Sequence, residues 1–469
     1  MKTRNLDMMI YGYLLTRIHY GFYREEEPLP SVQRLGKLFN VSAMAARGAY
    51  RLLERDGYIL NVRGRRTVAG DHIAGQEKAD LDGFFVSEEL MQDICSIFDL
   101  FFPEVFLYGL DASSEKEIQK LYGILDRPAL SWDEPTLDFM AHVIKGLKNP
   151  LLIDLYYDVA LLTYPAFLAH LGKSKEGWEE EHEKLAPLLY RLLHVREEGV
   201  RRSLWNQIAG RCPVSNAEKG AATEDPYEWG RRQTCLVAAG NILFQINSGV
   251  YPVDTFLPSA RILAEQTSTP IITMRRAIAL LNDLGIAESV NGKGTKVISP
   301  EKGRRKVKWR SPAVKKNVRL YLYAVHILAI TSQSLAVRAF PLMDVEMRKR
   351  IKHDIECLTE REEHAGTISY LCIKMLIDEM DLPSLREIYN KLLQYLILGQ
   401  PLSCLQPYLN LDGQAKELMA GLEGGDAMLF GKALQSSFSV MFSSSKAKAA
   451  AMGIEGLEEL ILPFSVEEE

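Results

Sequence analysis

Apolar residues along the chain recur mostly at spacings of three and four, which is the pattern of amphipathic helices. Segments 115–125 (EKEIQKLYGIL) and 347–358 (MRKRIKHDIECL) are typical of it. Two stretches differ, residues 58–69 and 286–298, because each has two short β-like runs around a basic turn. In the second stretch an Asn-Gly pair strengthens the prediction of a hairpin. The pattern therefore predicts a mainly α protein with two β-hairpins.

Each hairpin ends a longer segment, and the two segments have the same order of elements. A helix, at 6–20 or 234–247, stops at a glycine, as helix C-termini commonly do. A Leu-Pro-Ser motif follows, in which Ser31 and Ser259 are predicted N-caps of a second, short helix. A third helix then stops at another glycine, just before the hairpin. Three helices followed by a two-stranded hairpin are the elements of a winged helix-turn-helix.

The two segments align without a gap at one fixed offset, which brings Leu29 onto Leu257. The alignment preserves glycine, proline and arginine as well as apolar positions. Matched pairs include Gly21–Gly249, Pro30–Pro258, Ser31–Ser259, Leu35–Leu263, Arg47–Arg275, Gly57–Gly285, Gly64–Gly292 and Thr67–Thr295. Agreement over this length predicts that one ancestral unit was duplicated in tandem.

Length and charge add a domain organisation to this pattern. The 469 residues carry a net charge of −5, yet residues 1–75 and 226–310 each have more Lys and Arg than Asp and Glu. Basic segments in an acidic protein indicate that those segments bind a polyanion. We predict winged helix-turn-helix domains at 1–75 and 229–300, all-α effector or dimerisation domains at 82–211 and 312–465, a linker at 212–228 and a basic linker at 301–311.

The repeated segment resembles the DNA-binding domain of GntR-type transcriptional regulators, whose pattern is LPSxxxLAxxxxVSxxxVRxALxxLxxxGxxxxxxGxGTxV. The first copy matches it at Leu29, Pro30, Ser31, Leu35, Val41, Ser42, Arg47, Ala49, Leu53, Gly57, Gly64 and Thr67. The second copy matches it at Leu257, Pro258, Ser259, Arg261, Leu263, Ala264, Glu265, Thr273, Arg275, Ala277, Leu281, Gly285, Gly292, Gly294, Thr295 and Val297. Segments 139–159, 180–193 and 418–434 are similar to effector domains of the FadR/FCD branch of that family.

This resemblance implies that the third helix of each copy enters the major groove of double-stranded DNA and that the hairpin contacts DNA beside it. Short polar side chains near a helix start reach base edges, and cations hold phosphates. The predicted contacts in the first copy are Ser31, Gln33, Ser42, Arg47, Arg51, Arg63, Gly64, Arg65 and Arg66. In the second copy they are Ser259, Arg261, Thr273, Arg275, Arg276, Asn291, Gly292, Lys293 and Lys296.

The two copies differ at the start of the third helix. The first has the sequence AMAA at 43–46, which offers few hydrogen-bonding groups and favours contact with phosphates or thymine methyl groups. The second keeps Thr273 and adds Arg276. The copies are therefore expected to bind different half-sites.

Many FadR/FCD effector domains bind a divalent metal through one Asp and three His. The candidates for such a set are Asp138, His142 and His182. However, aligned on the Asn-Pro pair at 149–150, the family's histidine position falls on Met140, and no histidine occurs near Leu204. We predict no metal and no required cofactor. A metal-free apolar pocket for a small-molecule effector and the absence of any ligand remain as alternatives.

The rest of the sequence favours a cytoplasmic protein without membrane contact. Six cysteines form no CxxC pair, so reduced thiols are expected, and the N-terminus lacks a signal-peptide pattern. The apolar run at 151–171 contains Asp154, Asp158 and Pro165, which predicts a buried helix rather than a membrane span.

Taken together, these features predict a bacterial-type DNA-binding transcription regulator. Two GntR-type subunits would be fused as an intrachain pseudo-dimer, with a possible small-molecule effector and a possible homodimer of chains. No nucleophile elbow, HExxH motif or phosphate-binding glycine loop occurs, so no enzyme is predicted. The alternatives are a helical sensor or scaffold with degenerate winged helices that do not bind DNA, and an enzyme within the helical domains.

Overall fold

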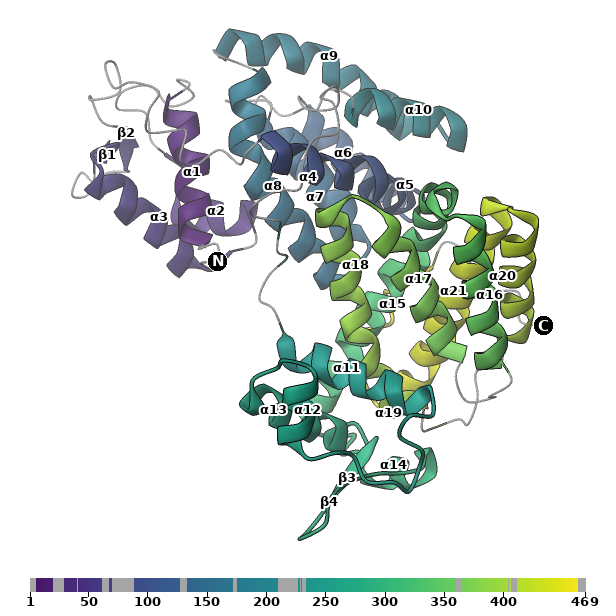
Figure 1. Cartoon of the computed structure of the whole chain (residues 1–469). Coiled ribbons are helices and arrows are strands. Elements are labelled where there is room, and N and C mark those ends of the chain that lie inside the picture. The colour runs from purple at the N-terminus through teal and green to yellow at the C-terminus, as the bar shows by residue number, and fades with distance from the viewer. Residues whose placement is uncertain are drawn as a thin grey trace. The chain divides into compact units, whose positions relative to one another are not determined.

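The computed structural model describes residues 6–19, 29–39, 41–60, 67–69, 88–126, 133–171, 175–209, 227, 229, 233–359, 365–403, 405 and 411–462. These residues are mostly helical, and their strands form two antiparallel hairpins (Figure 1). The prediction of a mainly α protein is confirmed. The chain divides into two compact units, Met1–Gly230 and Arg231–Glu469.

Unit 1 begins with three helices and a hairpin, called the first module here. These elements are α1 (Leu6–His19), α2 (Val32–Leu38), α3 (Ala43–Arg55), β1 (Ile59–Leu60) and β2 (Val68–Ala69). The Ser31 hydroxyl accepts a hydrogen bond from the Arg34 N–H and the Ser42 hydroxyl accepts one from the Ala45 N–H, each at 3.2 Å. These two bonds satisfy amides that lack a partner within the helices and fix where α2 and α3 begin.

The remaining helices of unit 1 pack around aromatic side chains. They are α4 (Glu88–Leu100), α5 (Phe102–Asp111), α6 (Glu115–Leu125), α7 (Asp133–Gly146), α8 (Pro150–Leu171), α9 (Lys175–His194) and α10 (Glu198–Ala209). Phe106 contacts Phe139 and Trp205, with ring centroids 5.9 and 4.8 Å apart. In α8, which contains the apolar run, Leu152, Leu155 and Val159 are buried, as expected of a core helix.

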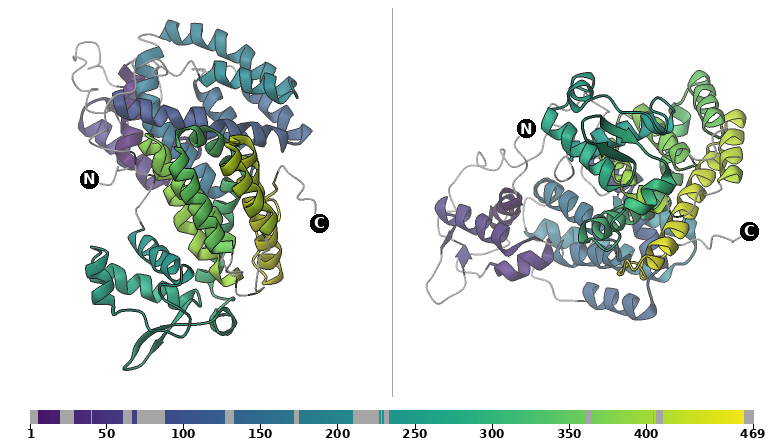
Figure 2. Two further views of the ribbon diagram at one scale, coloured as in Figure 1. Left: turned by 45° about the vertical axis from the view of Figure 1, so that its right-hand side comes forward. Right: turned by 90° about the horizontal axis from the view of Figure 1, so that it is seen from below.

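Unit 2 begins with the second module, which repeats the element order of the first. Its elements are α11 (Thr234–Asn247), α12 (Ala260–Gln266), α13 (Ile271–Asp283), β3 (Ala287–Val290) and β4 (Gly294–Val297). Figures 1 and 2 show the β3–β4 hairpin projecting away from the helices of this unit. The hairpin is antiparallel, with Ala287 opposite Val297.

Backbone hydrogen bonds recur at matching positions of the two modules. The Leu29 N–H donates to the Thr67 carbonyl at 2.9 Å, and the Leu257 N–H donates to the Thr295 carbonyl at 2.8 Å. After each third helix a glycine has positive φ, Gly57 at 81° and Gly285 at 73°. This left-handed conformation favours glycine because it lacks a Cβ, so the same turn leads from helix to strand in both modules.

Part of the segment 301–311, which the sequence predicts as a basic linker, is helical. Pro300–Lys306 form helix α14, in which Ser299 is the N-cap and Pro300 occupies the first turn. The amino groups of Lys302 and Lys306 both bond the Glu288 carboxylate of β3. Local composition suggested a solvated basic segment, but these ion pairs and the buried Gly303 and Val307 hold it against the second module.

A helical bundle completes unit 2. It contains α15 (Pro312–Ala339), η3 (Phe340–Leu342), α16 (Val345–Thr359), α17 (Ala365–Glu379), α18 (Pro383–Leu396), η4 (Ile397–Gly399), α19 (Gln400–Ser403), α20 (Asp412–Gly424) and α21 (Ala427–Ala451). The long helix α15 is central and packs against α17, α18 and α21. Within the described residues, Pro312–Leu342 is the one stretch long and apolar enough to span a bilayer, but 72% of its most apolar window is buried inside the protein.

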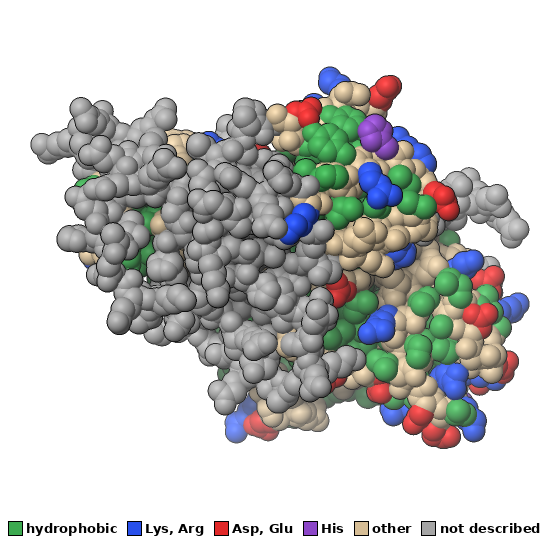
Figure 3. Space-filling model, turned by 90° about the horizontal axis from the view of Figure 1, so that it is seen from above, with side chains coloured by type: hydrophobic (Ala, Val, Ile, Leu, Met, Phe, Trp, Pro, Cys, Tyr) green, Lys and Arg blue, Asp and Glu red, His purple; other side chains and the backbone are tan. Residues whose placement is uncertain are grey.

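One face of the molecule is mixed in charge where its residues are described. On the face drawn in Figure 3, the described Lys and Arg side chains are interspersed with Asp, Glu and apolar ones. This distribution differs from the excess of cations in residues 226–310.

Acidification tests the packing of the bundle through His326. This side chain is fully buried in α15, and its Nε2 lies 3.0 Å from the Ile461 carbonyl. Burial lowers the pKa of His326 from 6.5 to about 4; the hydrogen bond to Ile461 partly opposes this shift, and nearby Lys446 adds to it. The unfolded chain thus binds a proton between pH 6.5 and 4 that the folded unit excludes. The free energy of unfolding should fall by up to about 3 kcal/mol as pH drops through this window.

The measurement is urea unfolding of the protein and of His326→Gln between pH 7 and pH 4. Gln retains an amide that can donate to the Ile461 carbonyl but does not titrate. The variant should therefore lose less stability on acidification than the native chain. Equal losses in the two proteins would contradict the assignment.

Candidate nucleic-acid interface

The third helix of the second module, α13, buries one face and exposes the other. Met274, Ala277 and Leu281 are buried, and α13 packs on α11 and α12. The exposed positions 272, 275, 276 and 279 follow the spacing of the opposite helix face. The amphipathic pattern therefore determines which side chains of α13 face solvent.

Two arginines on this exposed face are available to a partner. Neither Arg275 nor Arg276 makes a hydrogen bond or ion pair with another residue in the described part of the chain. Arg261 differs, because its guanidinium pairs with Glu265 at 3.0 Å on the surface of α12. The adjacent guanidinium groups of Arg275 and Arg276, exposed and without a partner among the described residues, form a suitable site for phosphates or base edges.

The hairpin adds polar and basic groups at its turn. Asn291, Gly292 and Lys293 are exposed, and Gly292 has a φ of 73°. Lys296 lies farther from the turn, on β4, and its amino group pairs with the Asp254 carboxylate at 2.7 Å. This contact lowers the pKa of Asp254. Lys293 is thus placed for an external contact, whereas Lys296 has an intramolecular partner.

The first module presents a weaker version of the same surface. In α3, Ala46, Ala49 and Leu53 are buried, and Arg47 and Arg51 are exposed. The Arg51 Nε donates to the Arg47 carbonyl at 3.4 Å. Gln33 is exposed on α2, while Arg63, Gly64, Arg65 and Arg66 lie outside the described residues. Arg47 and Arg51 are therefore separate charges one helical turn apart, whereas Arg275 and Arg276 of α13 are adjacent in sequence.

The two predicted capping serines have a dual capacity. Ser31 and Ser259 each accept a backbone N–H, with the Ser259 bond coming from Ile262 at 3.3 Å. A hydroxyl that accepts can still donate its hydrogen, so a phosphate oxygen could be bound as well. Both serines are exposed, which is compatible with this second role.

An exposed isoleucine near the start of α13, Ile272, is a feature that the sequence analysis does not single out. Met44 is 75% exposed and Ile272 is 63% exposed, and the two occupy matching positions of the modules. Ile271, next to Ile272, is also exposed. The signal that could have found Ile272 is helical spacing, since it precedes Arg275 by about one turn on the outward face. Thr273, which the sequence predicts as a contact, is half-buried.

The metal candidates do not form a described site. Asp138 and His142 lie on α7, and His182 lies on α9, where its side chain is not among those described. Burial and nearby Lys120 lower the pKa of His142. Over the described residues, no three His, Cys, Asp or Glu side chains are grouped so that they could hold a metal ion.

Comparison with known proteins identifies the first module. Residues 6–68 match the model of the bacterial regulatory proteins, gntR family, which assigns a GntR-family helix-turn-helix domain to this part of the chain. No curated protein matches the chain. The family match confirms the resemblance for the first copy of the motif.

Three solved structures are similar to the chain at low identity. GntR of Streptococcus agalactiae is 20% identical, with a TM-score of 0.20, and the match covers 45% of this chain and 99% of that chain. A Listeria monocytogenes protein, Lar, described as controlling expression of the agr system and mediating virulence, is 15% identical, with a TM-score of 0.21 and coverage of 46% and 99%. McbR/YncC of E. coli is 15% identical, with a TM-score of 0.23 and coverage of 48% and 98%.

Metal dependence can be tested by thermal unfolding. A metal that binds only the folded state would raise the Tm, and its removal would lower it. Because no bound metal is predicted, excess EDTA, Zn²⁺ or Mn²⁺ is expected to leave the Tm unchanged. A Tm that rises with one metal and falls with EDTA would contradict this expectation. Asp138→Ala and His142→Ala would then show whether α7 supplies the ligands.

Proposed function

We propose that the chain is a DNA-binding transcription regulator of the GntR type. The proposal rests on one observation. Arg275 and Arg276 are exposed on the outward face of α13 and have no anionic partner among the described residues. The family match at residues 6–68 supports the same function for the first module. In this proposal α3 and α13 enter the major groove, and the hairpins contact DNA beside it.

We further propose that the two modules arose by tandem duplication and act as a fused pseudo-dimer. The repeated backbone bonds at Leu29 and Leu257, and the positive φ of Gly57 and Gly285, support a common origin. The position that Arg276 occupies in the second copy is taken by a glycine, residue 48, in the first copy. Because a glycine cannot make the contacts of a guanidinium, the two helices would bind different half-sites.

The helical segments at 82–211 and 312–465 are proposed as effector and dimerisation domains. Their apolar cores, and the mixed charge of the described residues on the face drawn in Figure 3, suit contacts with protein or with a small molecule more than contacts with DNA. A small-molecule effector would change DNA affinity through its preference for one arrangement of a module and its helical domain. No metal or cofactor is required in this scheme, and two chains could also associate.

Charge reversal on α13 tests DNA binding. Arg275→Glu/Arg276→Glu should weaken binding to a DNA fragment selected by the protein from a random pool by at least about tenfold. The slope of log K against log salt should also become shallower by roughly 0.9 for each phosphate that the variant no longer neutralises. Fluorescence anisotropy over a salt series measures both quantities.

The control reverses two exposed cations of the helical bundle, Arg350→Glu/Lys416→Glu, and changes the net charge by the same amount. This variant should keep most of the affinity. Equal weakening in the two variants would point to nonspecific electrostatics. A native chain that selects no DNA but remains folded would favour the sensor or scaffold alternative.

An asymmetric operator is the second expectation. Footprinting should show that Arg47→Glu/Arg51→Glu reduces protection mainly over one half of the selected site, and Arg275→Glu/Arg276→Glu mainly over the other half. Symmetric sites built from either half alone should bind more weakly than the selected site. Reduced protection over the same base pairs in both variants would contradict the pseudo-dimer.

A further inference from the structure

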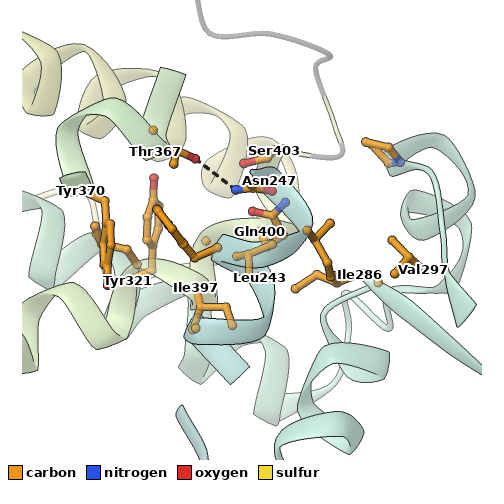
Figure 4. A pocket seen from close by; sticks show the side chains of 18 of the residues that line it. Leu243, Asn247, Ile286, Val297, Tyr321, Thr367, Tyr370, Ile397, Gln400 and Ser403 are labelled. Atoms are coloured by element: carbon orange, nitrogen blue, oxygen red, sulfur yellow. Dashed lines mark hydrogen bonds between the residues drawn. The ribbon is translucent and has the colours of Figure 1, made fainter. Parts of the chain in front are cut away.

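Unit 2 contains a cavity of about 330 Å³ at the junction of the second module and the helical bundle. The module supplies α11 and the segment around Ile286 and Val297, while the bundle supplies α17, α18 and η4. Figure 4 shows Tyr321 and Tyr370 toward one end of the cavity and Ile286 and Val297 toward the other. The volume lies at the lower end of the range for small-molecule sites.

The lining determines what kind of molecule could bind. Among the described residues that line the cavity, none is Asp, Glu, Lys, Arg or His. A charged ligand would lose its hydration there without gaining an opposite charge, so the site favours a neutral one. Phe244 and Tyr370 provide aromatic surface, with ring centroids 6.0 Å apart. Aromatic and aliphatic walls of this kind suit a ring system.

A few polar groups are available to orient such a ring. The Asn247 side-chain amide donates to the Thr367 hydroxyl at 3.0 Å, a bond that joins α11 to α17 (Figure 4). The Asn247 carbonyl oxygen can accept a further hydrogen bond. Gln400 and Ser403 also line the cavity. These groups suit a ligand with one or two hydroxyl or amide groups.

We propose that this cavity is the effector site, and that it binds a neutral, ring-containing molecule with one or two hydrogen-bonding groups. The regulatory part of this inference rests on the proposed function. Helix α11 packs against α13 within the module and against α18 and η4 of the bundle. A ligand between α11 and the bundle therefore changes how the module is held, and with it the position of Arg275 and Arg276.

Gly240 provides a way to block the cavity without disturbing the fold. It lies within α11 and lines the cavity, and a Cβ at this position would meet nothing within 4 Å. Gly240→Leu should therefore occupy part of the space, and it replaces a poor helix former with a good one. Gly413 in α20 is a matched control, since a Cβ there also meets nothing within 4 Å and the residue lies outside the cavity.

The experiment titrates the full chain with naphthol, which is neutral at pH 7, and with naphthoate, an anion of the same ring size. Isothermal calorimetry should show saturable naphthol binding to the native chain and to Gly413→Leu. Binding should be at least tenfold weaker for Gly240→Leu, and naphthoate should bind the native chain at least tenfold more weakly than naphthol. Thermal unfolding of each variant verifies folding.

Absence of naphthol binding, equal binding to Gly240→Leu, or equal binding of naphthoate would overturn the assignment of the site. Saturating naphthol should also change the affinity for the selected DNA by about fivefold or more, within the usual range of allosteric coupling. Unchanged DNA affinity in the presence of bound naphthol would refute the regulatory role. If naphthol binds as expected but the chain binds no DNA, the proposed function fails while the cavity assignment stands.

Discussion

Burial of one face of the third helix is the constraint on which each module depends. In α13, Met274, Ala277 and Leu281 enter the core, and helical geometry then fixes which side chains point outward. Arg275 and Arg276 are presented to solvent for this reason, without a bond to any other described residue. The buried apolar positions of α3 have the same effect in the first module. The buried apolar residues of each third helix thus determine which way its cations point.

The elements that depend on local chemistry could be predicted from the sequence. The capping role of Ser31 and Ser259 and the turn at Gly57 and Gly285 follow from residue type and spacing, and the structure has them where the pattern places them. The outward position of Arg275 follows in the same way from the spacing of its apolar neighbours. Such features need only residues within one or two helical turns.

Features that depend on distant contacts could not be predicted. The sequence predicts a basic linker at 301–311, but it does not predict helix α14 or the pairing of Lys302 and Lys306 with Glu288 on the preceding hairpin. The cavity between α11 and the bundle requires residues such as Asn247 and Thr367, which are far apart in the chain. The exposed Ile272 of α13 escaped prediction for a different reason, since an isoleucine carries no hydrogen-bonding group that marks it as a base contact.

The ion pairs of Glu288 also determine which solution conditions weaken the contact between β3 and α14. Lys302 and Lys306 lower the pKa of Glu288 to about 2, so the carboxylate keeps its charge at any pH near neutrality. Mild acid would therefore not break the ion pairs between β3 and α14. Because both lysines are exposed, dissolved ions can compete for them, and raised ionic strength would weaken these ion pairs. A salt series on this protein would accordingly report on the ion pairs between β3 and α14 as well as on its contacts with any nucleic acid.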